Sequence, residues 1–203
     1  MNVAVLGGGS WGTALANVLA QKGVGVVLWA RREDVAREIV ELGVNSRYLP
    51  GQALSPGLRA SSDLGTALRE AGCIVLAVPC QSLALFLREN RELFPCGAGF
   101  VCASKGVELE TFRTMGQVVA QELAGRAPRY AVLSGPSFAT EVVAGQPTAV
   151  ALGCADAELA DRVQGLFSTE TFRVYVNPDV TGVELGGAVK NIMAIASGIS
   201  NGL

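Results

Sequence analysis

The sequence predicts an α/β fold, in which a doubly wound, mostly parallel sheet carries helices on both faces and is followed by the first helix of an all-α unit. Along residues 1–178, short apolar runs alternate with segments of helical period, which is typical of strands joined by right-handed crossovers. The runs are apolar at consecutive positions, as in strands buried on both faces. After residue 178 the chain is Gly-rich and apolar on nearly every side. We therefore predict one domain over residues 1–178 and the start of a second over residues 179–203.

The individual elements follow from these two patterns, taken in chain order. The predicted strands are 2–7, 24–30, 58–61, 73–79, 99–104, 130–135, 148–153 and 172–176. The predicted helices are 10–23, 33–43, 61–71, 81–90, 114–124 and 157–167, with a loop over 44–51. Residues 179–203 are expected to form one long helix. A helix that is apolar all round has to be covered all round, either by a partner chain or by further residues of a second domain.

Composition excludes several classes of protein. The net charge is −2 and no Lys/Arg stretch is dense, so nucleic acid is not expected as a partner. No apolar stretch reaches the length of a membrane span and no signal peptide is found, so we predict a cytoplasmic protein without membrane insertion. The five cysteines include no C-x-x-C pair and are expected to be buried, reduced thiols without a metal; a metal site or a catalytic thiol is the alternative.

The sequence has no histidine, so proton transfer near neutral pH would need a lysine, cysteine, carboxylate or tyrosine whose pKa its surroundings shift. Lys190 lies in the apolar run 183–197, in a chain that otherwise favours arginine. A lysine can release its proton once desolvation or a cationic neighbour lowers its pKa, whereas an arginine cannot. Lys105, at the carboxyl end of the strand 99–104, is a candidate for that neighbour. A lysine snorkelling from an uncovered helix is the alternative for Lys190, and Lys22 is expected to be a surface residue.

A glycine turn joins the first strand to the first helix. Gly7, Gly9 and Gly12 form a G-x-G-x-x-G pattern, in which the glycines permit a tight turn, a close approach to a pyrophosphate and close packing of the helix. The pattern predicts a dinucleotide-binding, Rossmann-like domain; glycines used only for packing are the alternative. Arg31 and Arg32 directly follow the second strand, where guanidiniums would suit the 2′-phosphate of NADP. A solvated arginine pair that caps the next helix would leave NAD possible.

Six motifs in chain order, GGGSWGTALA, WARR, YLPG, SKG, SGPSFATEV and VELGGAVKN, make the sequence similar to the bacterial-type NAD(P)-dependent glycerol-3-phosphate dehydrogenases. The resemblance implies a Rossmann-like domain followed by a helical substrate domain. It implies reversible hydride transfer between NAD(P)H and dihydroxyacetone phosphate, giving sn-glycerol 3-phosphate for phospholipid synthesis, in a homodimer.

The resemblance also assigns roles to residues. Besides the glycine turn, the cofactor-binding residues would be Ser10, Trp11, Arg31, Arg32, Tyr48, Lys105 and Ala139. The substrate-binding residues would be Lys105, Gly135, Ser137, Lys190 and Asn191, with Lys190 as the catalytic acid/base and the nicotinamide near residues 77–79 and 134–137. The family's helical domain, which holds the substrate phosphate, is expected beyond Leu203, so we expect this chain to bind cofactor but to be inactive alone. Two other hypotheses remain: another reductase of the 6-phosphogluconate and hydroxyacid dehydrogenase-like superfamily, and a non-catalytic NADP-binding module.

Overall fold

A computed structural model describes residues 2–202 of the chain. Within them an eight-stranded sheet has the strand order β10-β9-β8-β7-β6-β1-β2-β5. Its strands are β1 (Asn2–Leu6), β2 (Val26–Trp29), β5 (Arg59–Ser61), β6 (Ala71–Leu76), β7 (Gly99–Cys102), β8 (Arg129–Ser134), β9 (Thr148–Gly153) and β10 (Phe172–Asn177). Neighbouring strands are parallel except at β8 and β9, which pair antiparallel, so β9 and β10 run against the other six strands. The predicted mostly parallel, Rossmann-like sheet is confirmed.

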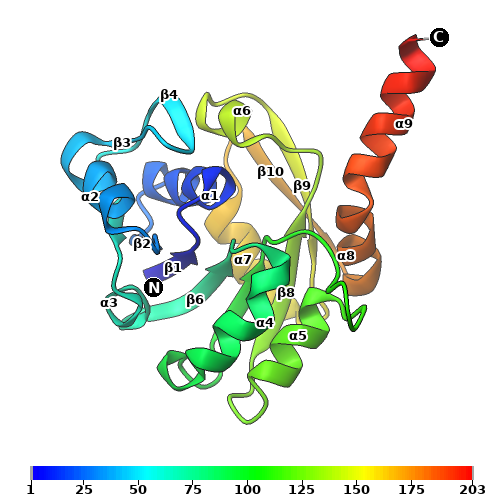
Figure 1. Cartoon of the computed structure of the whole chain (residues 1–203), viewed down its shortest axis with the longest axis horizontal. Helices are drawn as coiled ribbons and strands as arrows, with labels where there is room; N and C mark the ends of the chain where they lie inside the picture. Colours follow the sequence, from blue (N-terminus) through cyan, green and yellow to red (C-terminus); the bar gives the residue numbers. More distant parts are fainter. Residues whose placement is uncertain (1, 203) are drawn as a thin grey trace.

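Helices cover both faces of this sheet (Figure 1). They are α1 (Ser10–Gln21), α2 (Glu33–Leu42), α3 (Leu64–Leu68), α4 (Cys80–Glu89), α5 (Met115–Glu122), α6 (Ala139–Val143), α7 (Ala157–Phe167), α8 (Val180–Ala188) and α9 (Lys190–Gly202), with a 3₁₀ turn at Arg91–Leu93. The short helix α6 was not predicted. The segment expected to be a loop over 44–51 contains a small antiparallel hairpin of β3 (Val44–Asn45) and β4 (Leu49–Ala53).

The two layers follow from the alternation of side chains along each strand. In β1, Val3 and Val5 pack into one core cluster with residues of α1, α2, α6 and α7. Ala4 and Leu6 point the other way, into a second cluster with residues of α3, α4 and α5. Because successive residues of a strand face opposite sides, an uninterrupted apolar run can fill both cores at once.

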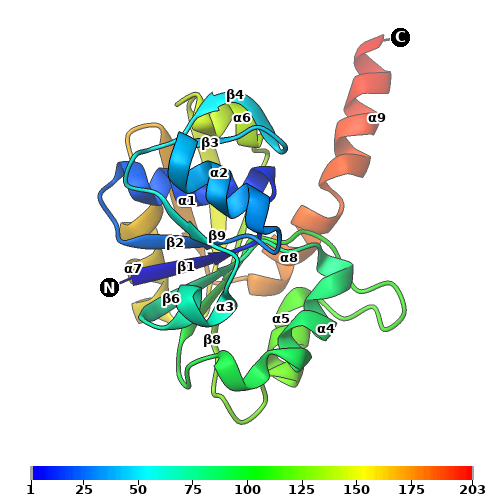
Figure 2. The ribbon, with the colours of Figure 1, turned by 60° about the vertical axis from the view of Figure 1, so that its left-hand side comes forward.

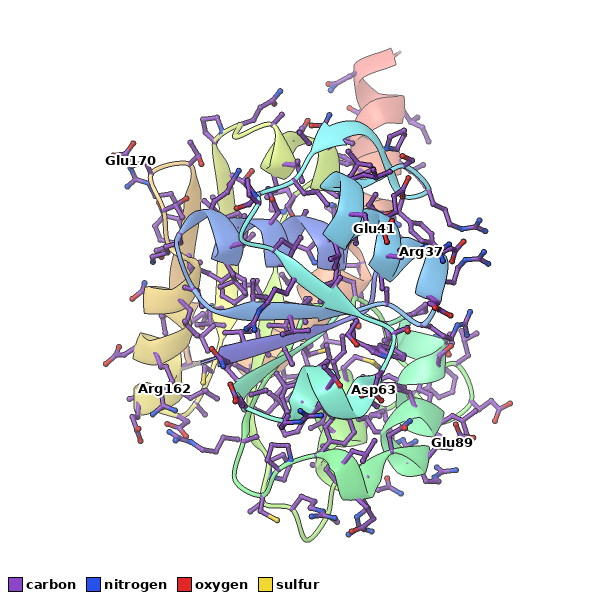
Figure 3. The ribbon with its side chains drawn as sticks, turned by 90° about the vertical axis from the view of Figure 1, so that its left-hand side faces the viewer. Arg37, Glu41, Asp63, Glu89, Arg162 and Glu170 are labelled. Atoms are coloured by element: carbon purple, nitrogen blue, oxygen red, sulfur yellow. The ribbon has the colours of Figure 1, made fainter. Side chains whose placement is uncertain are left out.

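The helix α2 shows the pattern by which a covering helix is recognised. Its residues Val35, Ala36 and Ile39 are buried against the sheet. Arg37 and Glu41 lie on the opposite side and point into solvent (Figure 3). This spacing places the apolar residues on one stripe of the helix, so the sequence fixes which side faces the core.

The C-terminal segment is two helices, so the prediction of one long helix over 179–203 was wrong. α8 ends at Ala188 and α9 begins at Lys190, with Val189 between them at φ −89° and ψ 0°. The two glycines before the break, Gly186 and Gly187, have low helix propensity. α8 packs against β8 and β9. α9 projects from the body of the molecule in both views (Figures 1 and 2), and none of its described residues is buried.

Candidate functional site

A cleft of about 1050 Å³ opens where the parallel strands β1, β2, β6 and β7 end. This is the edge of an open α/β sheet at which ligands usually bind. The glycine turn, the residues that follow β2, β6 and β7, and the start of α6 line it. All of the residues predicted to bind cofactor line this cleft: Gly7, Gly9, Ser10, Trp11, Gly12, Arg31, Arg32, Tyr48, Lys105 and Ala139.

The glycine turn has the shape that a pyrophosphate requires. Gly7 has φ +132°, and a Cβ there would overlap the carbonyl oxygen of Ala77. A Cβ on Gly12 would overlap the carbonyl oxygen of Gly7, so the helix can approach the strand this closely only with glycine. Gly9 caps α1, and no atom lies within 4 Å of the place of its missing Cβ. The start of α1 therefore presents free N–H groups to an open space that an anion can occupy.

The cleft is also lined by the residues predicted to surround the adenosine end of the cofactor, Arg31, Arg32 and Tyr48. Tyr48 lies beneath the guanidinium of Arg47, whose Cζ is 5.6 Å from the ring centroid. Arg32 pairs with Asp34, with Nη2 and Oδ2 2.7 Å apart. Arg31 makes no ion pair or hydrogen bond within residues 2–202. The two arginines therefore differ in how free they are to bind an anion.

Two lysines meet beside the cleft: Lys105 lines it, and Lys190 contacts residues of the loop 135–138 that line it. The Nζ of Lys105 donates a hydrogen bond of 3.0 Å to the carbonyl of Gly135 and lies 5.3 Å from the centroid of the Trp11 ring. The Nζ of Lys190 donates a hydrogen bond of 3.1 Å to the carbonyl of Ser137 and lies 4.8 Å from the centroid of the Phe138 ring. The loop 135–138 thus holds both ammonium groups at one place, although they belong to different elements.

The surroundings of Lys105 lower its pKa. Burial, and then the positive charge of Lys190 beside it, lower the pKa of Lys105 to about 8. The expected proximity of the two lysines is confirmed. The expected dry surroundings of Lys190 are not found within residues 2–202, because the residues that follow it in α9 are exposed and Lys190 itself is half-buried. The prediction took the apolar composition of 183–197 as evidence of burial, but composition does not show whether a helix such as α9 packs against the core or projects from it.

The predicted substrate residues are only partly brought together. Ser137 is buried and lines the cleft, and its backbone N–H and hydroxyl both donate to the carbonyl of Gly135. Gly135 and Lys190 do not line the cleft. Each is hydrogen-bonded to a residue that does, Gly135 to Lys105 and Lys190 to Ser137. Asn191 is exposed, and the structure shows no hydrogen bond from its side chain within residues 2–202.

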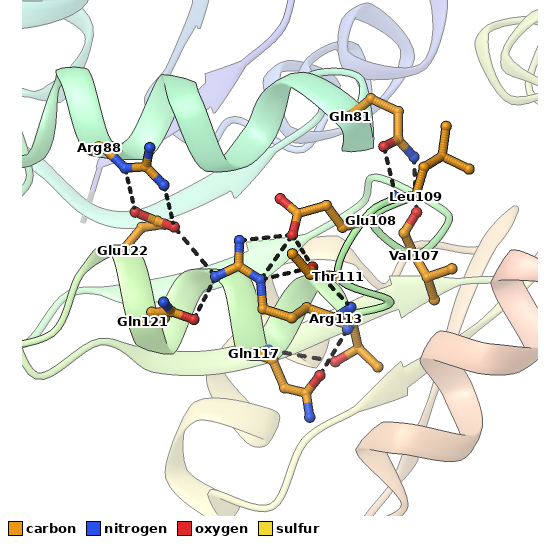
Figure 4. A network of polar contacts seen from close by, with 11 residues as sticks. Gln81, Arg88, Val107, Glu108, Leu109, Thr111, Arg113, Gln117, Gln121 and Glu122 are labelled. Carbon is orange, nitrogen blue, oxygen red and sulfur yellow. Dashed lines mark hydrogen bonds and ion pairs between the residues drawn. The ribbon is translucent and has the colours of Figure 1, made fainter.

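The loop that follows Lys105 is fastened to α4 and α5 (Figure 4). The amide of Gln81 donates to the carbonyl of Val107 at 2.8 Å and accepts from the N–H of Leu109 at 3.1 Å. Arg113, at the far end of the loop, pairs with Glu108 at 2.7 Å. This network continues into the two helices through Arg88, Gln121 and Glu122. Lys105 therefore projects from a braced segment.

Sequence reasoning missed Glu184, which lies in the VELGGAVKN motif. Its carboxylate is buried and accepts hydrogen bonds of 2.7 Å from the hydroxyl of Tyr130 and from the N–H of Gly116, in the first turn of α5. Burial raises the pKa of Tyr130, so its hydroxyl remains a donor. The sequence did contain a signal for Glu184: like Lys190, it is a charged residue in the apolar run 183–197. Phe138 was also missed, because an aromatic residue in a loop gives no sign of what it faces.

The cysteines are all free thiols. Cys73, Cys102 and Cys154 are buried, and burial raises the pKa of Cys73 and of Cys102 to about 12, as expected of inert thiols. Cys80 is half-buried and lines the cleft, and Cys96 is exposed, so the prediction of burial was wrong for Cys96. Over the described part of the chain, no cluster of potential metal ligands was found, and no helix has the length and hydropathy to cross a membrane.

Comparisons of sequence and of structure both find glycerol-3-phosphate dehydrogenases. The family model for the N-terminus of NAD-dependent glycerol-3-phosphate dehydrogenase matches residues 2–160, and the model for the C-terminus matches residues 179–203. A protein of Nitratidesulfovibrio vulgaris (strain DP4) named glycerol-3-phosphate dehydrogenase [NAD(P)+] is 55% identical over 203 residues, which are 100% of this chain and 62% of that protein. The crystal structure of glycerol-3-phosphate dehydrogenase from Coxiella burnetii superposes with a TM-score of 0.90 at 41% identity, over 99% of this chain and 61% of that one. The chain, which spans 62% of the length of that Nitratidesulfovibrio relative, therefore belongs to the NAD-dependent glycerol-3-phosphate dehydrogenase family.

Proposed function

We propose that this chain provides the cofactor site and the proton donor of an enzyme that transfers hydride reversibly between NAD(P)H and dihydroxyacetone phosphate, giving sn-glycerol 3-phosphate. The observation that carries this proposal is the pair of amines, Lys105 and Lys190, which one loop holds beside a cleft whose glycine turn suits a pyrophosphate. NADP is the proposed cofactor, with NAD possible, because Arg31 at the adenosine end has no competing partner within residues 2–202.

We assign each residue of the site one role in binding or in proton transfer. Gly7, Gly9 and Gly12, with the first turn of α1, hold the pyrophosphate. The reduced nicotinamide, when bound, supplies the hydride. Lys105 orients the carbonyl oxygen of the substrate and, with a pKa of about 8, keeps its charge at neutral pH. Lys190 is the proposed general acid, because an ammonium can give up a proton to the developing alkoxide and a guanidinium cannot.

The residues of the loop 135–138 and Asn191 complete the proposed substrate site. Gly135 and Ser137 fix the two ammonium groups through their carbonyls, so the amines are placed before substrate arrives. Asn191 would meet the substrate only once α9 is covered. Two ammoniums at one place favour an anionic substrate, and a phosphate ester supplies that charge.

We also propose that residues 1–178 are the cofactor domain and that residues 179–203 begin a helical substrate domain. The exposed, apolar α9 supports this division, and α8, which packs on the sheet, would join the two domains. We propose a homodimer for the whole enzyme, a role in phospholipid synthesis, and a cytoplasmic location. Free thiols at all five cysteines fit a reducing compartment.

The experiment that tests the function uses this chain extended to the length of its relatives. NADPH absorbance is followed with and without dihydroxyacetone phosphate. We expect oxidation of NADPH only when the triose phosphate is present. The control variant Lys22→Met should behave in the same way, because the side chain of Lys22 hydrogen-bonds to carbonyls at the end of α7 and not in the cleft. A protein that binds NADPH but never oxidises it would be the non-catalytic module, and the proposed reaction would be wrong.

A further inference from the structure

Two adjacent arginines at the adenosine end of the cleft have different electrostatic surroundings. Both Arg31 and Arg32 line the cleft. The guanidinium of Arg32 makes a bidentate pair with Asp34, in which Nε lies 3.0 Å from Oδ1 and Nη2 lies 2.7 Å from Oδ2. Arg31 has no such partner within residues 2–202. The second charge of the pair that the sequence offers to a phosphate is therefore already in use.

Asp34 is not itself among the residues that line the cleft, so it acts on a ligand through Arg32. The carboxylate of Asp34 is ionised at neutral pH, where it offsets the charge of the guanidinium, and the hydrogen bonds from Arg32 lower its pKa further. A dianionic 2′-phosphate also binds a guanidinium in a bidentate manner, so Asp34 takes one edge of Arg32, Nε and Nη2, away from it and offsets the positive charge that attracts it. A 2′-hydroxyl, as in NAD, makes no such demand.

We propose that Asp34 determines cofactor specificity: by holding Arg32 in an ion pair, it reduces the preference of this chain for NADP(H) and leaves NAD(H) binding unaffected. This inference rests on the proposed function, since it takes the cleft to bind a nicotinamide dinucleotide. The side chains of the pair are 47% and 51% exposed, so a ligand can reach and compete for Arg32. Exposed ion pairs are weak, and the size of the effect is correspondingly modest.

The test measures dissociation constants of NADPH and NADH for the 203-residue chain, from the change in nicotinamide fluorescence. In Asp34→Asn, we expect NADPH to bind about two- to fivefold more tightly and NADH to bind as before. Glu33→Gln is the matched control. It removes one negative charge from the same first turn of α2, but the structure shows no ion pair at Glu33 within residues 2–202. A smaller gain in Glu33→Gln than in Asp34→Asn separates release of Arg32 from a general change in charge.

A double-mutant cycle with Arg32→Gln tests whether Asp34 acts on cofactor binding through Arg32. If Asp34 acts through Arg32, Asp34→Asn leaves the ratio of the two constants unchanged in the Arg32→Gln background. Unchanged or weaker NADPH binding in Asp34→Asn, an equal gain in Glu33→Gln, or persistence of the gain without Arg32 would each overturn the inference while leaving the dinucleotide site intact. Failure of the unaltered chain to bind either nucleotide would instead overturn the proposed function.

Discussion

Lys105 and Lys190 reach the same place from different elements, the first from the residues after β7 and the second from the start of α9. Each ammonium has one carbonyl acceptor and one aromatic ring face, and these contacts offset part of the repulsion between the two charges. The remaining repulsion, together with burial, lowers the pKa of Lys105. At the scale of single residues, the site is therefore a coupled pair of amines.

This coupling predicts how Lys105 titrates. Because the charge of Lys190 contributes to the lowered pKa, Lys190→Met should move the titration midpoint of Lys105 from about 8 toward its ordinary value of 10.5. The midpoint can be followed by NMR of lysines labelled at Cε. Lys22→Met serves as the control and should leave the Lys105 midpoint in place. A midpoint that does not respond to Lys190→Met would show that the two amines are not coupled.

The same shift predicts a dependence of stability on pH. The pKa of Lys105 is lower in the folded chain than its ordinary value, so between pH 8 and pH 10.5 the unfolded chain binds more protons. The free energy of unfolding therefore rises with pH across this window as far as Lys105 is concerned. Denaturant unfolding of the unaltered chain and of Lys105→Met should show a difference that changes in favour of the unaltered chain as pH rises through the window. A pH-independent difference would contradict the shift.

At the scale of elements, the position of Lys190 depends on how α8 is fixed to the sheet. Glu184 joins α8 to β8 and to the first turn of α5 through Tyr130 and Gly116. Gly187 lies against the sheet, where a Cβ would overlap the hydroxyl of the buried Ser134. The neighbouring Gly186 has no atom within 4 Å of the place of its missing Cβ. The two glycines of one motif are therefore not equivalent.

A pair of alanine variants tests this difference. Alanine favours a helix over glycine, so Gly186→Ala should raise the free energy of unfolding by up to about 1 kcal/mol. Gly187→Ala gains the same propensity but meets Ser134, and overpacking of this kind costs about 1–3 kcal/mol. Urea unfolding should therefore rank Gly187→Ala below Gly186→Ala, and adding Ser134→Ala should restore much of the difference. Equal stabilities of the two glycine variants would contradict close packing of α8 at Gly187.

At the scale of the whole molecule, the sequence predicts the sheet well because both of its faces are buried, and burial on both faces leaves a continuous apolar run. The direction of β9 is not in that pattern, since a run of apolar residues reads the same in either direction. The hairpin of β3 and β4 and the short helix α6 depend on tertiary contacts that a local pattern does not contain. The break at Val189 does have a local signal in Gly186 and Gly187, which the prediction of one long helix did not use.

Some parts of the candidate site could be predicted from the sequence and others could not. The glycine turn could be placed from the sequence because its spacing follows from the geometry of a strand, a tight turn and a helix. The carbonyls of Gly135 and Ser137 that hold the amines could not, because every residue has a carbonyl. The pairing of Arg32 with Asp34 was also out of reach, since two residues so close in sequence can point in several directions.

The exposed side chains of α9 predict self-association of the chain. Ile192, Met193, Ile195 and Ile199 are each at least 60% exposed and follow one another along a single helix. Apolar surface of this kind favours association in water. Light scattering of the 203-residue chain should show an apparent mass that rises with concentration. Ile195→Glu should reduce the rise, whereas Val40→Glu, at an apolar residue 59% exposed on α2, should not. A monomer at all concentrations would contradict the prediction.

The turnover of Lys190→Arg is the most direct test of proton donation by Lys190. The measurement compares kcat for dihydroxyacetone phosphate and the dissociation constant of NADPH, in the chain extended to the length of its relatives, with and without the substitution. Arginine keeps the positive charge but cannot release the proton, so kcat should fall by about 10²- to 10⁴-fold while NADPH binding stays the same. A variant that retains the kcat of the unaltered enzyme would show that the proton comes from elsewhere.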